Sequence, residues 1–194
     1  KVLGYLDVLR DKKPVGKTVA LIGAGGIGFD TAEFLLHEGT SPSLDAAKFF
    51  AEWGVDASYS GRGGLAAAHI EASPRKVYLL QRKVSKVGDG LGKTTGWIHR
   101  AALQMKRVEM IGGVNYERIT PEGLFVSYGE QRRDGQLIEC DTIVLCAGQE
   151  PLRELQAPLA AAGVAVHLIG GADEAGELDA KRAIDQGTRL AARL

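Results

Sequence analysis

Hydrophobic residues along the chain form short runs rich in Val, Ile and Leu, and glycine or polar residues separate these runs. Such runs are typical of β-strands. Six strands are predicted, over residues 18–22, 76–81, 108–111, 124–128, 137–145 and 165–169. Helical spacing of apolar positions predicts helices over residues 27–37, 44–53 and 178–194, and residues 5–9 form a further helix-like apolar patch. Because strands and helices alternate, the pattern favours an α/β fold with a mostly parallel sheet and helices on both faces.

One pair of strands departs from this alternation. A polar loop that contains Asp134-Gly135 joins the strand at 124–128 to the strand that begins at residue 137. This arrangement is typical of an antiparallel hairpin, which would cross over between strands of the main sheet.

The connection over residues 39–74 is longer than the roughly 2–6 residues that usually follow a helix in such a fold. It contains a helix start at Ser41-Pro42-Ser43-Leu44, with Ser43 as the expected cap, and a glycine-rich tip at 61–64. We therefore expect residues 39–74 to form a surface insertion.

The composition is that of an ordinary globular chain that can bury a core: 45% of the 194 residues are hydrophobic. Lys and Arg number 24 and Asp and Glu 24, and a net charge of zero argues against nucleic acid as a partner. No run approaches the roughly 18 apolar residues of a membrane helix, and the first residues lack the pattern of a signal peptide. We expect a cytoplasmic protein with no membrane partner. The first residue is Lys1, which indicates a part of a longer protein.

The candidate catalytic and metal-binding side chains form no recognisable set. Cys140 and Cys146 lie in one apolar stretch at a spacing that fits neither a disulfide framework nor a metal site, so we expect buried free thiols. The four histidines show no mutual ligand spacing, and no Ser, His and Asp cluster indicates a nucleophile. We assign no catalytic residue and no metal site.

The strongest motif is Gly23-Ala24-Gly25-Gly26-Ile27-Gly28, which fits G-x-G-x-x-G between a predicted strand and a predicted helix. In this motif the first glycine permits a tight turn, the second lets the backbone approach a diphosphate, and the third lets the helix pack against the strand. The N–H groups and dipole of the helix N-terminus then favour phosphate. The predicted cofactor-binding residues are Gly23, Gly25, Gly26, Ile27 and Gly28. The alternative is a glycine-rich turn without a ligand.

The end of the second strand decides which dinucleotide binds. That strand ends in Gln81-Arg82-Lys83, with no carboxylate to accept a hydrogen bond from a ribose 2′-hydroxyl. Arg82 offers a planar fork to a phosphate and Lys83 adds a point charge, so we predict NADP(H) rather than NAD(H). The alternative is a basic strand end that is merely solvated.

Two later strands also run into glycine turns. The first contains Ala147-Gly148, where small residues would let the backbone pass close to a cofactor. The second contains Gly170-Gly171 and then Asp173, whose carboxylate could accept hydrogen bonds from a polyol or could instead cap a helix. In contrast, Gly92-Lys93-Thr94 is not a nucleoside-triphosphate loop, because Val87 stands where that motif needs glycine.

Four stretches carry a family resemblance: VALIGAGGIGFD at 19–30, GLGKTTGWIHR at 90–100, CAGQEP at 146–151 and HLIGG at 167–171. Together they resemble the C-terminal part of bacterial NADPH-dependent 2,4-dienoyl-CoA reductases, in the group of flavin and iron–sulfur enzymes that includes trimethylamine dehydrogenase. The resemblance covers essentially the whole chain. It implies that NADPH gives a hydride to FAD, and that electrons pass through a 4Fe–4S cluster to FMN, which reduces a dienoyl-CoA thioester in unsaturated fatty acid oxidation.

The resemblance also implies a domain plan. Residues 1–16 would be a connecting segment and residues 17–149 a Rossmann-like NADP-binding domain with the insertion at 39–74. Residues 150–194 would be the C-terminal segment of a FAD-binding domain. The FMN, the iron–sulfur cluster and the CoA thioester would bind elsewhere in the same polypeptide, because only one G-x-G-x-x-G motif and no cluster-type cysteine set are present. This fragment alone would be inactive.

By position, the resemblance places Ala147 and Gly148 at the cofactors, with Gly148 between NADP and FAD, and Asp173 at the FAD ribityl chain. The N-terminus of the last helix would point its dipole at the flavin ring. The residues at that helix start are Glu177, Leu178 and Asp179. Ala172 separates Gly171 from Asp173, whereas related flavoproteins often have adjacent Gly-Asp. A nucleotide-sensing module without a redox role is the alternative function.

Overall fold

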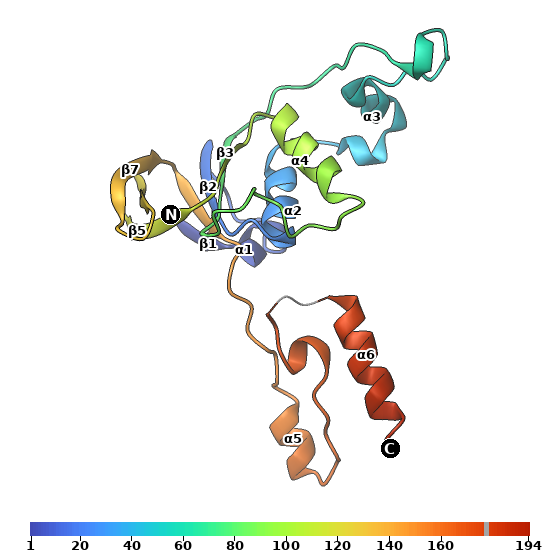
Figure 1. Cartoon of the computed structure of the whole chain (residues 1–194), viewed down its shortest axis with the longest axis vertical. Coiled ribbons are helices and arrows are strands. Elements are labelled where there is room, and N and C mark those ends of the chain that lie inside the picture. The colour runs from blue at the N-terminus through green and yellow to red at the C-terminus, as the bar shows by residue number, and fades with distance from the viewer. Residues whose placement is uncertain (177–178) are drawn as a thin grey trace. The chain divides into compact units, whose positions relative to one another are not determined.

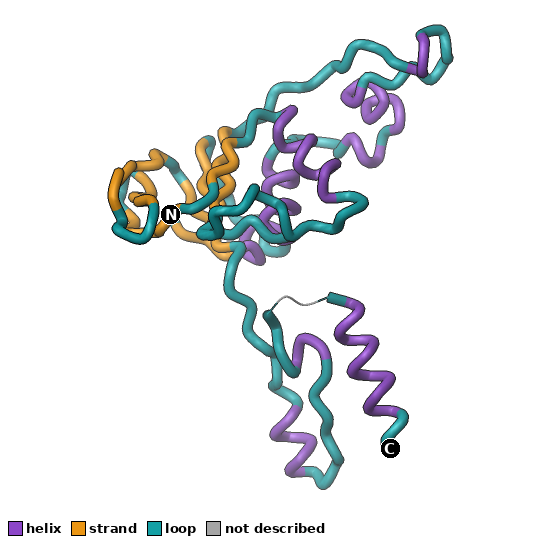
Figure 2. The backbone as a smooth tube through the Cα atoms, in the orientation of Figure 1, coloured by secondary structure: helices purple, strands orange, loops and turns teal. Residues whose placement is uncertain are grey.

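The computed structural model describes residues 1–176 and 179–194 (Figure 1), and these form two compact units, Lys1–Ala147 and Gly148–Leu194. Each unit is described by itself. The first contains a five-stranded parallel sheet, a three-stranded antiparallel sheet and helices (Figure 2). The second contains short helices and loops.

The parallel sheet has the strand order β1-β8-β2-β3-β4. Its strands are β1 (Val2–Gly4), β8 (Thr142–Leu145), β2 (Thr18–Ile22), β3 (Lys76–Leu80) and β4 (Glu109–Ile111). Every pairing is parallel, and β2 lies at the centre. Ile22 stands opposite both Leu80 and Leu145, so β2, β3 and β8 end at the same edge of the sheet.

Helices cover one face of this sheet. They are α1 (Tyr5–Leu9), α2 (Gly26–Leu35) and α4 (Gly96–Met105). Alternate residues of a strand point to opposite faces, and Val19 and Leu21 of β2 share a core with Phe29 of α2 and Leu103 of α4. Burial of these side chains holds the helices on the sheet. The helix patch expected at residues 5–9 is α1.

The antiparallel sheet covers the other face, where we expected helices. Its strands, in the order β5-β6-β7, are β5 (Val114–Ile119), β6 (Gly123–Tyr128) and β7 (Arg133–Glu139). Ala20 and Ile143 of the parallel sheet share a second core with Val126 and Ile138 of this sheet. The expected hairpin is confirmed as the β6–β7 pair.

Two strand predictions are wrong. The apolar run at 137–145 is two strands in different sheets, β7 and β8, because the chain bends at Asp141. There the backbone N–H of Asp141 donates to the Thr18 carbonyl, and the Thr18 N–H donates to the Asp141 carboxylate, both at 2.8 Å. Residues 165–169 form no strand, since the described part of the second unit offers no other strand to pair with.

The insertion contains α3 (Ala46–Trp53), which confirms the predicted helix, and two short 3-10 turns, Pro42–Leu44 and Arg62–Gly64. Ser43 is not its cap. The Asp45 carboxylate accepts hydrogen bonds from the N–H groups of Ala47 and Lys48, both at 3.1 Å, because a carboxylate here is closer to the helix start than Ser43.

Lys106 of the first unit fixes the insertion to α4. Its ammonium lies 2.6 Å from the Glu52 carboxylate of α3 and donates to the Glu71 carbonyl at 2.9 Å. Only 4% of the Lys106 side chain and 12% of the Glu52 side chain are exposed. The ion pair is therefore buried, and it joins both the outgoing and the returning parts of the insertion to the core.

The second unit contains α5 (Gln156–Ala161), a 3-10 turn (Gly170–Ala172) and α6 (Ala180–Ala191). Arg153 holds its loops together, because its guanidinium donates to the carbonyls of Ala172, at 2.7 Å, and Asp173. Across the described parts of both units, no helix combines the length and the apolar character that crossing a bilayer requires.

Candidate dinucleotide-binding site

The first glycine of the motif begins a turn directly after β2. Gly23 has a φ of +110°, a conformation that favours glycine, and its N–H donates to the Leu80 carbonyl of β3 at 2.9 Å. A Cβ at Gly23 would lie 2.9 Å from the Cβ of Ala147, which follows β8. The structure thus brings Gly23 and Ala147 together at the sheet edge where β2, β3 and β8 end.

The third glycine sets how closely α2 approaches the sheet. A Cβ at Gly28 would lie 1.9 Å from the Gly23 carbonyl oxygen and 3.3 Å from the Leu79 Cδ1 of β3. No real side chain fits at 1.9 Å from a backbone oxygen. Helix α2 therefore packs on the turn and on β3 at a distance that only glycine allows.

The helix N-terminus between these glycines faces open space. Within the described residues, nothing lies within 4 Å of a Cβ built at Gly25 or Gly26. The first helical hydrogen bond runs from the Phe29 N–H to the Gly25 carbonyl, at 3.1 Å, and the first turn holds no acidic side chain. The N–H groups of Gly26, Ile27 and Gly28 precede that bond, so this end of α2 suits an anion.

The strand order places this turn at a switch in topology. From β2 the chain continues to its neighbour β3 on one side, and it later returns to β8 on the other side. Ligands of open α/β sheets bind in the crevice at such a point, beyond the carboxyl ends of the strands. Gly23 directly follows the end of β2, and Ala147 lies two residues after the end of β8.

The two predicted phosphate-binding cations follow β3 at the same edge. Arg82 and Lys83 are exposed, and no carboxylate of the described residues forms an ion pair with either. Burial raises the pKa of Tyr116 to about 12, although the charge of Arg82 acts in the opposite direction. The two cations are thus available to an added anion.

Sequence patterns give no role to two residues that shape this edge, Gln81 and Arg100. The Gln81 amide donates to the carbonyls of Lys83 and Ser85, and the Arg100 guanidinium donates to those of Val87 and Gly88. No sequence signal reveals such bonds, because any residue type can supply the backbone carbonyl that accepts them.

The remaining predicted cofactor residues belong to the second unit. Gly148 has a φ of +81°. The Asp173 carboxylate accepts a hydrogen bond from the Gln186 amide at 2.9 Å, and the Asp179 carboxylate caps α6 by accepting from the Arg182 N–H at 2.7 Å. Gly171 lies in the 3-10 turn, but the left-handed residue there is its neighbour Gly170, at +57°. Glu177 and Leu178 lie outside the described residues.

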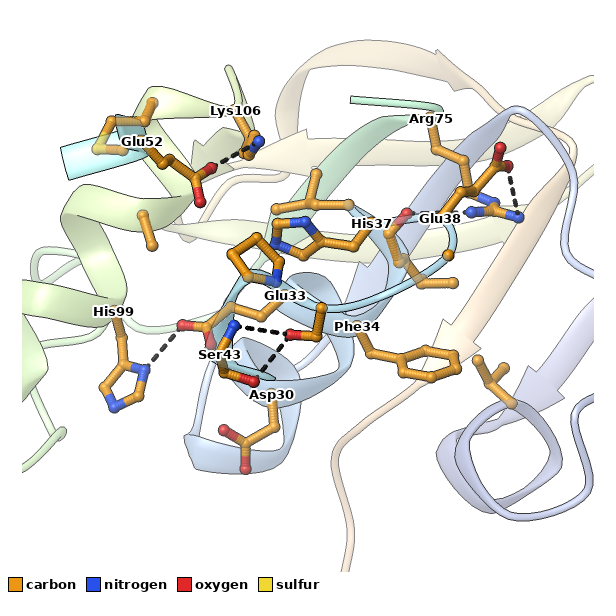
Figure 3. A pocket seen from close by; sticks show the side chains of 18 of the residues that line it. Asp30, Glu33, Phe34, His37, Glu38, Ser43, Glu52, Arg75, His99 and Lys106 are labelled. Atoms are coloured by element: carbon orange, nitrogen blue, oxygen red, sulfur yellow. Dashed lines mark hydrogen bonds and ion pairs between the residues drawn. The ribbon is translucent and has the colours of Figure 1, made fainter. Parts of the chain in front are cut away.

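A cavity of about 750 Å³ lies away from the glycine turn, among α2, α3 and α4 (Figure 3). It is lined by the C-terminal half of α2, whereas the glycine turn adjoins the N-terminus of that helix. Several of its charged groups pair with one another: His99 Nδ1 lies 2.7 Å from Glu33 Oε1, and Lys106 pairs with Glu52. The cavity and the glycine turn are therefore separate features, and only the turn carries the predicted dinucleotide-binding residues.

The expectation of buried free thiols is confirmed. Cys140 and Cys146 are free and buried. No group of three or more His, Cys, Asp or Glu among those residues is placed to hold a metal ion.

Comparisons with known proteins identify a family. The profile of the family described as "Pyridine nucleotide-disulphide oxidoreductase" matches residues 6–180. A metal reductase of Desulforamulus reducens is 23% identical to this chain over 172 residues, which are 89% of this chain and 24% of that protein.

Two solved structures share the fold. A 2-naphthoyl-CoA reductase in complex with 2-naphthoyl-CoA superposes with a TM-score of 0.65 and 19% identity, over 100% of this chain and 23% of that one. Histamine dehydrogenase from Rhizobium sp. 4-9 superposes with a TM-score of 0.66 and 17% identity, over 100% of this chain and 26% of that one. The chain therefore spans about a quarter of the length of the relatives it matches.

The family match includes the glycine turn, every strand of the two sheets except β1, and most of the second unit. Proteins of this family bind a pyridine nucleotide and FAD and carry out oxidation and reduction. The chain belongs to the pyridine nucleotide-disulphide oxidoreductase family.

Proposed function

We propose that this chain is the NADP(H)-binding part of a larger flavin-dependent reductase of the 2,4-dienoyl-CoA reductase type. In this proposal residues 17–149 bind the nucleotide, residues 1–16 connect them to preceding chain, and residues 150–194 complete a FAD-binding domain. The observation that carries it is the open N-terminus of α2 at the same sheet edge as two cations, Arg82 and Lys83, that form no ion pair with the described residues.

The glycine turn would hold the diphosphate. The N–H groups at Gly25, Gly26 and Ile27 would donate to its oxygens, and the missing side chains at Gly25 and Gly26 leave the space that it needs. Ala147 contributes a small side chain where β8 ends, so its backbone would pass close to the nucleotide.

The end of β3 would select the phosphorylated form of the adenosine. An NAD-binding site of this fold uses an acidic side chain at the ribose 2′-hydroxyl, but residues 81–83 are Gln-Arg-Lys. The Arg82 guanidinium would form paired hydrogen bonds with a 2′-phosphate, and the Lys83 ammonium would add charge.

The second unit would contribute to FAD binding through Gly148, Gly171, Asp173, Glu177, Leu178 and Asp179. The Gln186 amide orients the exposed Asp173 carboxylate, which could accept hydrogen bonds from ribityl hydroxyls. Bound NADPH would supply the hydride that FAD accepts. Large apolar side chains of this unit are exposed: Leu152, Leu155 and Ile184 are each 67% to 73% exposed. This exposure supports the proposal that another part of the FAD-binding domain packs against them.

A CoA thioester is the proposed substrate of the whole enzyme. Two observations support it: the four sequence stretches that resemble dienoyl-CoA reductases, and the fold shared with a 2-naphthoyl-CoA reductase. The proposed FMN and 4Fe–4S cluster would lie in the part of the enzyme beyond this chain, which spans about a quarter of its relatives.

Titration of the purified chain with NADPH and NADH, followed by calorimetry, tests the nucleotide role. We expect NADPH to bind at least about tenfold more tightly, since charge-assisted hydrogen bonds each contribute about 1.5–3 kcal/mol. Equal affinities would contradict the NADP assignment, and no binding of either would contradict the nucleotide site. Absence of flavin absorbance in the longer native protein would favour a nucleotide sensor instead.

A further inference from the structure

The loop that follows β3 carries three exposed cations. We call residues 82–88 the cation loop; it contains Arg82, Lys83 and Lys86. Long, flexible side chains lose entropy when a ligand orders them, and a rigid backbone beneath them reduces that cost. Hydrogen bonds that hold the loop backbone should therefore increase its affinity for a phosphate.

Gln81 directly precedes the loop and holds its backbone in place. Its Nε2 donates to the Lys83 carbonyl at 3.0 Å and to the Ser85 carbonyl at 2.7 Å, so both amide hydrogens are used on the loop backbone. The Gly113 N–H also donates to the Lys83 carbonyl, at 2.9 Å. The first half of the loop is thus fixed to the end of β4.

Arg100 of α4 binds the other end of the loop through hydrogen bonds. Its Nε donates to the Val87 carbonyl at 3.1 Å, and its Nη2 donates to the Gly88 carbonyl at 3.0 Å. Among the described residues, no carboxylate forms an ion pair with Arg100. The guanidinium fork is therefore directed at two consecutive carbonyls rather than at an acidic partner.

The end of the loop packs closely against helix α2. Gly88 has a φ of +78°, and a Cβ at Gly88 would lie 2.6 Å from the Phe29 Cζ. Phe29 directly follows Gly28, so this contact relates the cation loop to the proposed diphosphate site. The close approach of Gly88 to the Phe29 ring restricts movement of the loop end relative to α2.

We infer that Gln81 and Arg100 are positioning residues for recognition of the 2′-phosphate. They would not touch the nucleotide; they would hold the backbone from which Arg82 and Lys83 reach it. This inference rests on the proposed NADP(H) function and adds two residues to it.

The test compares adenosine 2′,5′-bisphosphate with adenosine 5′-monophosphate, because the two probes differ only in the 2′-phosphate. Calorimetric affinities are measured for the 194-residue chain and for Gln81→Leu and Arg100→Lys. Both substitutions leave the net charge and the loop cations unchanged, and lysine cannot bond both carbonyls through a planar fork. Gln131→Leu, in the exposed turn between β6 and β7, is the matched control.

We expect each loop variant to lower the preference for the bisphosphate by about 3–10-fold, as expected for side chains that must now be ordered on binding. Affinity for the monophosphate and the preference of Gln131→Leu should stay within about twofold of the unsubstituted chain. Near-ultraviolet circular dichroism checks that each variant is folded. The two variants independently test the hydrogen bonds that Gln81 and Arg100 donate to the loop backbone.

The wild-type preference in both folded loop variants would overturn the inference while leaving the NADP(H) assignment intact. If instead the unsubstituted chain bound the bisphosphate and the monophosphate equally, the proposed NADP(H) function itself would be wrong. The measurements thus distinguish failure of the positioning role of Gln81 and Arg100 from failure of the NADP(H) assignment.

Discussion

The carbonyl oxygen of Gly23 lies 1.9 Å from the position that a Cβ would occupy on Gly28. The two glycines are therefore a steric pair: the turn made by the first closes the space for any side chain on the second. A nearby position, Gly26, lies at the same helix start but faces open space. Gly28 is therefore required by packing within the chain, whereas a glycine at position 26 leaves space for a ligand.

Gly28→Ala should destabilise the first unit by about 1–3 kcal/mol, because the added methyl must displace the turn or the helix. Urea unfolding followed by circular dichroism measures this change. Gly26→Ala is the matched substitution, and it should leave stability unchanged or raise it by up to about 1 kcal/mol, since alanine favours a helix. Gly26→Ala should nevertheless weaken NADPH binding, because its methyl would enter the proposed diphosphate space. Equal stability of the two variants would contradict the steric pair.

Arg82→Ala should lower NADPH affinity by about tenfold to a hundredfold, the effect of losing charge-assisted hydrogen bonds to phosphate. NADH affinity should change by less than about twofold, because NADH lacks the 2′-phosphate. Calorimetric titration with both nucleotides measures the two effects. Arg133→Ala removes the same charge from the exposed strand β7 and should preserve both affinities. Parallel losses for NADPH and NADH would argue against a 2′-phosphate contact.

Lys106→Met should destabilise the first unit by roughly 3–5 kcal/mol, because the Glu52 carboxylate would remain buried without its partner. The double variant Glu52→Leu with Lys106→Met should recover much of that loss, since it removes both charges. Limited proteolysis offers a local measurement: cleavage within residues 39–74 should accelerate in the single variant. If the single and double variants were equally stable, the ion pair would not explain how the insertion is held.

Burial raises the pKa of Cys146 to about 11, from an ordinary value near 9, although a hydrogen bond with Thr31 acts in the opposite direction. Below pH 9 the thiol is protonated in both the folded and the unfolded chain, and this group contributes no pH dependence. Between pH 9 and 11 the unfolded chain loses the proton first, so the free energy of unfolding should fall by at most about 2–3 kcal/mol.

Chemical unfolding at pH 8 and at pH 10.5 measures this dependence, with Cys146→Ala as the comparison. The alanine variant should show a smaller decrease in stability over that interval, because every other titrating group is retained. An identical decrease in both proteins would show that the Cys146 thiol does not contribute.

Local patterns predicted the parts of the fold that depend on neighbouring residues. Strand β2, the glycine turn and helix α2 follow one another without interruption, and each has its own signal: an apolar run, spaced glycines and helical periodicity. The β6–β7 hairpin was predicted for the same reason, from Asp134-Gly135 between two apolar runs.

The errors arose where tertiary pairing decides the structure. The segment 137–145 has apolar residues on both sides of Asp141, because both β7 and β8 contribute to one core between the two sheets. The sequence alone does not show that the two sides belong to different sheets. Strand β1 has three residues, too few for a periodic signal, and forms by pairing with β8. Strand β5 does alternate, with Val114 and Tyr116 packed in that core, and this signal could have been found.

The candidate site shows the same division. Gly23, Gly28 and Arg82 could be selected from the sequence, because the chemistry they provide depends on residue type and order. Gln81 and Arg100 could not, because their bonds reach backbone carbonyls whose positions depend on the folded chain.

The insertion connects the end of α2 to the start of β3. Both of these points lie far along their elements from the glycine turn, which joins the end of β2 to the start of α2. An exposed position of helix α3 can therefore accept a fluorescent label without occupying the proposed nucleotide edge, which offers a practical signal for binding experiments.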